Sequence, residues 1–388
     1  MKDNSVTISE VKDLGKNKCP ENLDKLLKLY EVVSNIDIKR EIVSSIGRQK
    51  DYDTVYSFIK NNVYSCNCMD LVYQMYRTLL YRQSIEKFYQ LKIDVEKFYN
   101  NEIIEKMNRY WKYKHSKHNK QEVVQRQTEP VILCGDSKNE LKKIAKGSIN
   151  MIFTSPPYYN ARIYTNYRSY KDYLSQMKAI FVECHRVLED GRFIIINVSP
   201  VITKRPGREF ESIRYPIHFD FHKILLEAGY YFIDEIIWVK PESTVPNRVG
   251  GYRQTRKPLS YKPNCITESI MVYRKNSDFL LDKNIAKYPN FVKDDEDFDT
   301  SNCWYINPKS DKNHPAVFPE ELCEKVLKYY SFEQDVVLDP FAGSGTLGKV
   351  ALQMNRVPVL CEQNKEYTKI IRKNLSKAMT DGINQRNS

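Results

Sequence analysis

The sequence predicts an α/β fold, with helices on both faces of a largely parallel sheet and an α-helical domain before it. Three observations support this fold. After residue 128, short apolar runs of strand length alternate with amphipathic runs of helix length. Before residue 128, apolar residues recur at helical spacing. The 388 residues also exceed what one small core needs, so two domains are expected.

Composition and charge limit the classes of protein to which this chain can belong. A hydrophobic share of 41% and a charged share of 28% are typical of soluble globular proteins. No apolar run approaches the ~18 residues of a membrane span, and residues 1–5 lack the apolar stretch of a signal peptide. Nine cysteines, an odd number, indicate reduced thiols and a cytoplasmic protein. The net charge of +12 is compatible with a polyanionic partner, although many basic proteins bind none.

Residues 1–127 are predicted to form the helical domain. Three amphipathic runs stand out, at 23–30, 38–46 and 68–79. Residues 38–60 resemble one HEAT-type helical hairpin, so we expect HEAT-like hairpins. Such a domain either serves DNA binding, dimerisation or partner docking, or only packs against the next domain. Basic and aromatic residues then alternate over 106–126; they either follow a phosphate backbone or, as we favour, form a solvated helix face before a linker.

Residues 128–388 carry the alternating pattern of the second domain. A helix is favoured wherever apolar residues share one face, and a buried strand wherever a short apolar run ends in Gly, Pro or Asp. Gly191 is expected to turn the chain into one such strand. The expected strands are 131–134, 149–153, 193–196, 232–239, 268–274, 336–338 and 357–361, and the expected helices 141–145, 173–188, 216–228, 319–330 and 347–354.

The first motif is Thr154-Ser155-Pro156-Pro157-Tyr158, which follows the predicted strand 149–153. Two prolines without backbone N–H groups stop the strand, so a hydroxyl stands at its carboxyl end, where α/β sheets bind ligands. One interpretation is a Ser-Pro-Pro turn in a surface loop. However, the motif resembles the (Asp/Asn/Ser)-Pro-Pro-(Tyr/Phe) catalytic loop of the DNA amino methyltransferases, which use S-adenosyl-L-methionine.

The resemblance implies roles for Ser155, Pro156, Pro157 and Tyr158 as catalytic residues. An exocyclic amine is a poor nucleophile because its lone pair is delocalised into the ring. The Ser155 Oγ and the Pro156 carbonyl would accept both amine hydrogens and direct the lone pair at the sulfonium methyl. Tyr158 would stack on the target base after the base leaves the duplex.

The second motif is Asp339-Pro340-Phe341-Ala342-Gly343-Ser344-Gly345-Thr346, again a strand that runs into a helix. Its glycines let a ligand approach the backbone, and with Gly348 it also matches the Gly-x-Gly-x-x-Gly fingerprint of dinucleotide sites. It resembles more closely the cofactor loop of the amino methyltransferases. Glu362, 17 residues after Gly345 (362 − 345), is placed to accept from ribose hydroxyls in either case. The cofactor-binding residues implied are Asp136, Thr154, Asp339, Phe341, Gly343, Gly345, Thr346 and Glu362.

A third feature, residues 313–322, resembles the His-Pro-Ala-x-Phe-Pro-like segment that closes over the methionine end of the cofactor in this family. A well-capped helix beginning at Pro319 explains most of the same residues. The catalytic loop precedes the cofactor loop, which is similar to the permuted β-type order. The resemblance covers residues 130–378 and implies a Rossmann-like methyltransferase fold with a mixed seven-stranded sheet, both loops meeting where the strand order reverses.

DNA recognition is assigned to insertions near 203–214, 241–263 and 276–312. Basic, glycine-containing loops follow phosphates and let arginine reach guanine edges, although each loop is equally well a solvated surface segment. Four acidic residues at 294–297 would repel phosphates. The candidate DNA-binding residues are Arg205, Arg208, Arg248, Arg253, Arg256 and Lys257.

The resemblance also suggests a target base. Serine in the first motif position is typical of cytosine-N4 enzymes, and aspartate of adenine-N6 enzymes. Cytosine-C5 chemistry lacks its nucleophile because the sequence has no Pro-Cys dipeptide. We expect a cytosine-N4-specific methyltransferase of double-stranded DNA, with a cognate restriction endonuclease as a plausible partner and no metal. Adenine-N6 methylation, an RNA or protein amide methyltransferase, and a non-catalytic DNA-binding protein remain alternatives.

Overall fold

The computed structural model describes residues 6–116, 127–159, 167–203, 207, 209–210, 212–247, 249–256, 258–279, 299–309 and 318–386. The chain divides into two compact units, Met1–Gln121 and Glu122–Ser388. Among the described residues, none of the helices combines the length and the apolarity that crossing a bilayer requires.

The N-terminal unit is helical, as the periodicity predicts. Several helices begin at a side chain that caps the first turn, as Asn35, Asp51 and Asn101 do by accepting backbone N–H groups. The described helices surround one apolar core that includes Leu26, Ile46 and Met75. Their bounds are α1 Ile8–Lys16, α2 Pro20–Val32, α3 Ile36–Gly47, α4 Tyr52–Asn62, α5 Met69–Tyr81, α6 Glu86–Tyr99 and α7 Glu102–His115. The HEAT-like assignment stays a prediction.

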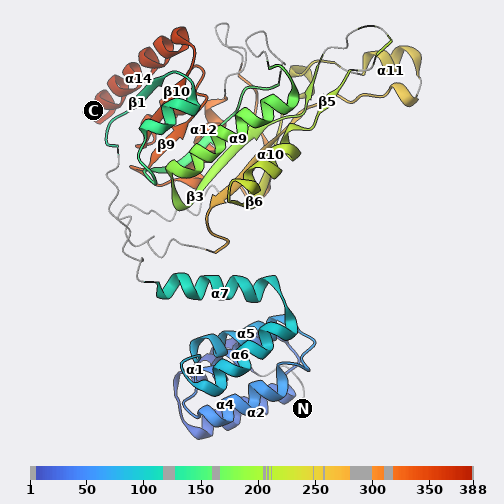
Figure 1. Ribbon diagram of the computed structural model, residues 1–388, viewed down its shortest axis with the longest axis vertical. Helices are drawn as coiled ribbons and strands as arrows, with labels where there is room; N and C mark the ends of the chain where they lie inside the picture. Colours follow the sequence, from blue (N-terminus) through green and yellow to red (C-terminus); the bar gives the residue numbers. More distant parts are fainter. Residues whose placement is uncertain are drawn as a thin grey trace. The chain divides into compact units, whose positions relative to one another are not determined.

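The second unit is built on a sheet of eight described strands in the order β1-β10-β9-β2-β3-β7-β6-β8 (Figure 1). β7 runs antiparallel to both of its neighbours, and every other pairing in this sheet is parallel. The strands are β1 Val131–Cys134, β2 Ile149–Thr154, β3 Leu188–Val198, β6 Tyr230–Val239, β7 Thr267–Lys275, β8 Cys303–Tyr305, β9 Val336–Asp339 and β10 Val357–Glu362.

The sequence predicted the α/β class and seven of these strands, but the sheet has an eighth. β8 pairs with the edge strand β6 at Ile237↔Cys303. It lies inside the insertion 276–312, which we expected to serve DNA recognition, and its three residues are too few to give a periodic signal.

Two boundaries also differ from those predicted. β3 begins at Leu188, where α9 (Tyr170–Val187) ends, and so continues through Gly191 instead of starting after it. A register shift between Ile149 and Met151 of β2 absorbs this early start. The helix expected over 141–145 is α8 (Ser137–Glu140), followed by a single 3-10 turn over Leu141–Lys143.

Helices cover both faces of the sheet. On one face, α9 and α10 (Ile217–Glu227) pack on inward-facing strand residues such as Ile152 and Ile194. On the other face, α12 (Glu320–Tyr330) and α13 (Thr346–Gln353) pack on Phe153 and Ile195. α14 (Lys365–Arg386) packs on Leu360 beside them. Because successive strand residues alternate between the faces, both layers are anchored on one buried sheet.

The chain leaves this framework twice within the segments predicted to recognise DNA. A two-stranded sheet joins β4 (Val201–Ile202) and β5 (Arg214–Tyr215). Between β6 and β7 lie two 3-10 turns, Glu242–Thr244 and Pro258–Ser260, and the short helix α11 (Gly250–Thr255), which Figure 1 shows away from the sheet.

Candidate active site

The strand order reverses at the centre of the sheet, between β9 and β2. β9 leads through α13 to β10 on one side, whereas β2 leads through α9 to β3 on the other. The two central strands are parallel and paired at Met151↔Val337 and Ile152↔Leu338. Both predicted loops follow carboxyl ends at this reversal, which is where open α/β sheets bind ligands.

A hydrogen bond joins the two loops. Thr154 Oγ1 donates to Asp339 Oδ1 at 2.6 Å, although the residues are 185 positions apart in the chain. The backbone N–H of Phe341 donates to the same oxygen at 3.0 Å. Both partners are buried, Thr154 at 0% and Asp339 at 3% exposure. The structure therefore brings the catalytic loop and the glycine loop to one place, as the sequence predicted.

The buried carboxyl of Asp339 is electrostatically perturbed. Burial raises the pKa of Asp339 to about 7, against the opposing effects of the hydrogen bonds from Thr154 and from the Phe341 backbone; the charge of Glu362 raises it further. The side chain therefore changes its charge near neutral pH.

The glycine loop exposes backbone where side chains would otherwise stand. Gly343 and Gly345 have φ values of 55° and 81°, a region that favours glycine. A Cβ on Gly345 would lie 3.0 Å from Ile371 of α14. Gly345 is also the residue before α13, and half-buried Thr346 is the first residue of that helix. The loop thus brings backbone without side chains, and a helix N-terminus, to the sheet edge.

An acidic side chain ends the neighbouring strand. Glu362 closes β10, with Oε2 accepting from the Gly343 N–H at 2.8 Å and Oε1 from the Asn364 N–H at 2.7 Å. Burial raises the pKa of Glu362, whereas these backbone bonds act to lower it. Asp136 lies just after β1, the strand next to β10. Asp136 is exposed and caps α8 by accepting from the Lys138 N–H at 3.0 Å. Carboxylate oxygens beside a glycine loop and a helix N-terminus form a set of acceptors and donors that fits a nucleoside.

The catalytic loop is held at the same edge. Pro156 is buried, and Ser155, Pro157 and Tyr158 are half-buried. The Tyr158 hydroxyl donates to Glu268 Oε2 at 3.0 Å, so the ring is fixed at its far end. Burial raises the pKa of Tyr158 well above its ordinary value, and the nearby Glu268 charge adds to the effect. Tyr158 therefore stays a neutral phenol, which suits a stacking surface.

The sequence did not identify Glu268 and its neighbours as part of the site. Glu268 is near the start of β7, and because β7 is antiparallel, this start lies at the edge where the other strands end. Its carboxylate accepts from Asn197 Nδ2 of β3 at 2.6 Å and from Lys240 Nζ after β6 at 2.6 Å. The available signal was a polar residue at the end of an apolar strand, as Asn197 is after 194–196.

Asn197 keeps one atom unpaired. It is 2% exposed, and within the part of the chain that the structure describes its Oδ1 has no hydrogen-bond partner. Asn197 follows Ile196, the strand partner of Thr154, so it stands beside Ser155 at the strand ends. A buried acceptor without a donor costs free energy, which a bound ligand with an N–H group would recover.

Tyrosines hold the end of the catalytic loop. Tyr159 packs edge-on against Tyr170 and Tyr215, with ring centroids 5.2 Å and 4.9 Å apart, and it also contacts Tyr173 of α9. The two consecutive tyrosines therefore have different surroundings, since Tyr158 is hydrogen-bonded to Glu268 and Tyr159 is buried among other tyrosine rings.

The third sequence feature lies mostly outside the described residues, since residues 313–317 fall there. Of the remainder, Phe318 stacks on Phe153 of β2 with centroids 4.6 Å apart. Pro319 is the residue before α12 instead of its first helical residue, a shift of one position from the prediction.

The predicted DNA-binding residues are only partly described. Arg253 lies on α11 and Arg256 directly after it, both exposed to solvent. Tyr252 and Tyr261 contact each other through their rings and brace this segment. The other four predicted residues, Arg205, Arg208, Arg248 and Lys257, lie outside the described residues.

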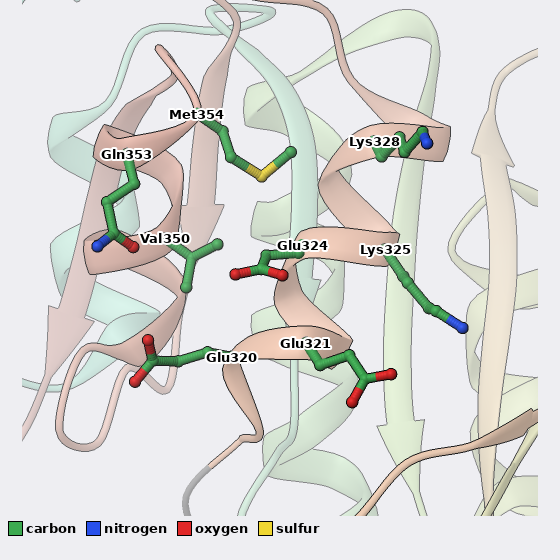
Figure 2. A pocket seen from close by; sticks show the side chains of 8 residues that line it. All are labelled: Glu320, Glu321, Glu324, Lys325, Lys328, Val350, Gln353 and Met354. Carbon is green, nitrogen blue, oxygen red and sulfur yellow. The ribbon is translucent and has the colours of Figure 1, made fainter. Parts of the chain in front are cut away.

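A groove of about 600 Å³ lies between α12 and α13 and is separate from these loops. Figure 2 shows charged side chains of α12 opposite Val350, Gln353 and Met354. Glu320 at one end pairs with Lys349 at 2.8 Å. Two of its lining residues, Glu320 and Glu321, belong to the sequence feature 313–322, but none is among the predicted catalytic, cofactor-binding or DNA-binding residues.

The sequence matches a family model for N6/N4 DNA methylases over residues 149–373, more than half of the chain. Among curated relatives, the type II β methyltransferase M.BslI of Bacillus sp. (strain NEB-606) is 27% identical over 65% of this chain. That match covers only 28% of M.BslI. M.HpaI of Haemophilus parainfluenzae, a type II methyltransferase, is 29% identical over 66% of this chain and 77% of its own length.

Solved structures share the fold. TTHA0409, a putative DNA modification methylase from Thermus thermophilus complexed with S-adenosyl-L-methionine, has a TM-score of 0.51 and 24% identity, covering 64% of this chain and 94% of that one. The cytosine-N4-specific PvuII DNA methyltransferase has a TM-score of 0.50 and 18% identity, covering 64% of this chain and 87% of that one. With a family match that includes both loops of the candidate site, the chain belongs to the N6/N4 DNA methylase family.

Proposed function

We propose that this protein is a site-specific DNA methyltransferase that transfers a methyl group from S-adenosyl-L-methionine to the exocyclic N4 amine of a flipped cytosine. One observation carries the proposal. The hydrogen bond from Thr154 to Asp339 holds the Ser-Pro-Pro-Tyr loop beside the glycine loop at the reversal of the sheet. The same place therefore has acceptors for an amine and a cradle for a nucleoside.

The residues around the glycine loop fit the cofactor, which supplies an electrophilic methyl group on a positively charged sulfur. Glu362 accepts from the ribose hydroxyls while the Gly343 N–H holds its carboxylate in place. Gly343 and Gly345, both at positive φ, bring backbone close to the ligand without side chains in the way, and Thr346 begins α13 beside them. Asp136, Thr154, Asp339 and Phe341 complete the walls.

The catalytic loop treats the amine as a hydrogen-bond donor. Ser155 Oγ and the Pro156 carbonyl accept its two hydrogens, so the nitrogen lone pair is freed from conjugation and directed away from the ring. The ring of Tyr158, fixed by Glu268, stacks on the base. The unpaired Oδ1 of Asn197 offers one more acceptor beside Ser155. The amine has only two hydrogens, so the Asn197 oxygen is an alternative acceptor to the other two, and none of these oxygens is needed as a nucleophile.

The choice of cytosine over adenine rests on Ser155. A neutral serine in the first motif position is typical of N4 enzymes, whereas an aspartate is typical of N6 enzymes. Adenine N6 is the second candidate, because its amine offers the same two hydrogens to the same acceptors.

Double-stranded DNA is the proposed substrate. The exposed Arg253 and Arg256 contact its backbone or its bases, together with Arg205, Arg208, Arg248 and Lys257. We further propose a cytoplasmic enzyme of a restriction–modification system with a cognate endonuclease, and an N-terminal HEAT-like domain that supports binding of DNA or a partner.

Nucleoside analysis of DNA from cells that express the protein tests the proposal. We expect N4-methylcytosine with the wild type and none with Ser155→Ala, while the variant retains its affinity for DNA. N6-methyladenine would select the second candidate. If neither base appears in vivo or with purified protein, DNA and labelled cofactor, the proposal is wrong. Labelling of RNA or protein in parallel reactions would then identify the true substrate.

A further inference from the structure

The Glu268 carboxylate joins two sides of the sheet edge. Its Oε2 accepts from the Tyr158 hydroxyl of the catalytic loop at 3.0 Å and from Asn197 Nδ2 of β3 at 2.6 Å. Its Oε1 accepts from Lys240 Nζ at 2.6 Å. The side chains of Glu268 and Lys240 are largely shielded, with exposures of 13% and 14%. Each oxygen thus has its own donors, and the carboxylate is held in one orientation.

Lys240 lies at the stem of the insertion 241–263. It directly follows β6, and its backbone N–H donates to the carbonyl of Ile266, just before β7, at 2.8 Å. Glu268 is the second residue of β7. The ion pair therefore closes the stem where the insertion leaves the sheet and returns to it. Beyond the stem, the insertion carries α11 and its exposed arginines.

The orientation of the carboxylate depends on Lys240. Without this lysine, Oε1 would have no donor, and an unpaired carboxylate oxygen in a shielded site is unfavourable. The group would turn, and its two oxygens would compete for the hydrogens of Tyr158 and Asn197. The Tyr158 ring would then lose the bond that fixes its far end. The position of the ring therefore depends, through Glu268, on the lysine at the stem of the insertion.

We propose that Glu268 and Lys240 are positioning residues that link the stem of the insertion 241–263 to Tyr158, so that the ion pair at the stem fixes the ring that stacks on the flipped base. A shielded ion pair adds little net stability over an apolar pair of the same shape, which agrees with a role in geometry. This inference rests on the proposed function, because it concerns stacking by Tyr158 and DNA contact by the insertion.

A double-mutant cycle between Lys240 and Tyr158 tests the link. Lys240→Met removes the donor and the charge, and Tyr158→Phe removes the hydroxyl that Glu268 holds. We expect each variant to lower kcat about tenfold, the effect of one hydrogen bond. Because both act on the same contact, the double variant should also lose about tenfold, whereas independent effects would give about hundredfold. The affinity for S-adenosyl-L-methionine should change by no more than about twofold in all three.

A matched control separates the link from the general loss of an ion pair. Lys325 of α12 has similar surroundings, since its Nζ pairs with Asp299 at 2.6 Å and lies 5.4 Å from the ring centroid of Trp304. Lys240 Nζ lies 5.3 Å from the ring centroid of Trp238. Lys325→Met therefore removes a similar set of contacts away from the catalytic loop, and it should leave kcat within about twofold.

An unchanged kcat for Lys240→Met or for Tyr158→Phe overturns the inference, and so does a loss of about hundredfold in the double variant. An equal loss in Lys325→Met also overturns it, because the effect would then be general. If Lys240→Met does not fold, Lys240→Gln, which is neutral but polar, takes its place in the cycle with the same expectations. If the wild type methylates DNA and Ser155→Ala does not, yet the two losses multiply, this inference alone fails. A wild type without activity on DNA overturns the proposed function instead.

Discussion

Replacing Thr154 by valine tests the bond that joins the two loops. Valine has nearly the shape of threonine but no hydroxyl, so Thr154→Val removes the 2.6 Å bond to Asp339 and leaves the packing in place. Asp339 keeps the N–H of Phe341 as its donor. Because the site is fully buried, no water replaces the lost hydroxyl at low cost.

The magnitude depends on pH. The pKa of Asp339 is about 7, above the ordinary 3.8, so the native state favours the neutral form of this side chain. The contribution of Asp339 to the stability of the fold therefore declines as pH rises from about 4 to about 7. At pH 8.5 the lost bond is to a carboxylate, which costs about 1.5–3 kcal/mol, and at pH 5.5 it is to a neutral acid, which costs about 0.5–1.5 kcal/mol. For a domain of this size the unfolding temperature should fall by about 3–12 °C and about 1–6 °C, respectively.

Thermal unfolding of wild type and variant at the two pH values measures this difference. The transition of the catalytic unit is identified as the one that shifts when S-adenosylhomocysteine is added. Thr154→Ser is the matched control, because it keeps the hydroxyl and should lose stability equally at both pH values. If Thr154→Val has the same effect at pH 5.5 and at pH 8.5, or none, the bond does not carry the charge-dependent energy assigned to it.

Three further predictions concern the loops and the DNA. Gly345→Ala should lower the free energy of unfolding by about 1–3 kcal/mol, more than Gly147→Ala does. Both glycines have positive φ, but only a Cβ on Gly345 would meet a neighbouring atom within 4 Å. Equal losses in chemical denaturation would show that this steric contact has no effect. Glu362→Gln replaces one acceptor oxygen by an NH2 donor, so one of the two backbone N–H groups loses its partner. Calorimetry should show at least about tenfold weaker cofactor binding, and unchanged affinity would remove Glu362 from the site. The double variant Arg253→Ala, Arg256→Ala should bind DNA more weakly. In fluorescence anisotropy, the slope of log affinity against log salt concentration should become shallower by about 0.9 for each phosphate that is no longer neutralised. An unchanged slope would show that neither arginine contacts a phosphate.

Most of the fold was predictable because its strands are local hydrophobic signals. Val131–Cys134 is a partly buried apolar run and Val357–Glu362 a mostly buried one, and each has the length of a strand and polar residues at its ends. β8 was not predictable, since a three-residue edge strand exists only through its pairing with β6. The start of β3 was also missed, because Leu188 continues the apolar stripe of α9 while it pairs with Ile149 of β2.

Some residues of the candidate site were likewise predictable from the sequence, and others were not. Thr154 and Asp339 were predictable from motifs, each of which lies within one strand and its loop. Glu268, Asn197 and Lys240 were not, because they belong to three different strands or their ends and have no common spacing in the chain. Only the order of the strands brings them together, and an antiparallel β7 is needed to place Glu268 at the same edge.

The position of β9 has a consequence for synthesis of the protein. β9 lies in the middle of the sheet, between β10 and β2, yet it is among the last strands that a ribosome would produce. Until it emerges, β2 has an unpaired edge and β1 has no neighbour, since β1 pairs with β10. A nascent chain that stops before Val336 therefore contains the Ser-Pro-Pro-Tyr loop but neither the glycine loop nor the centre of its sheet. The candidate site cannot assemble before translation of this unit is nearly finished.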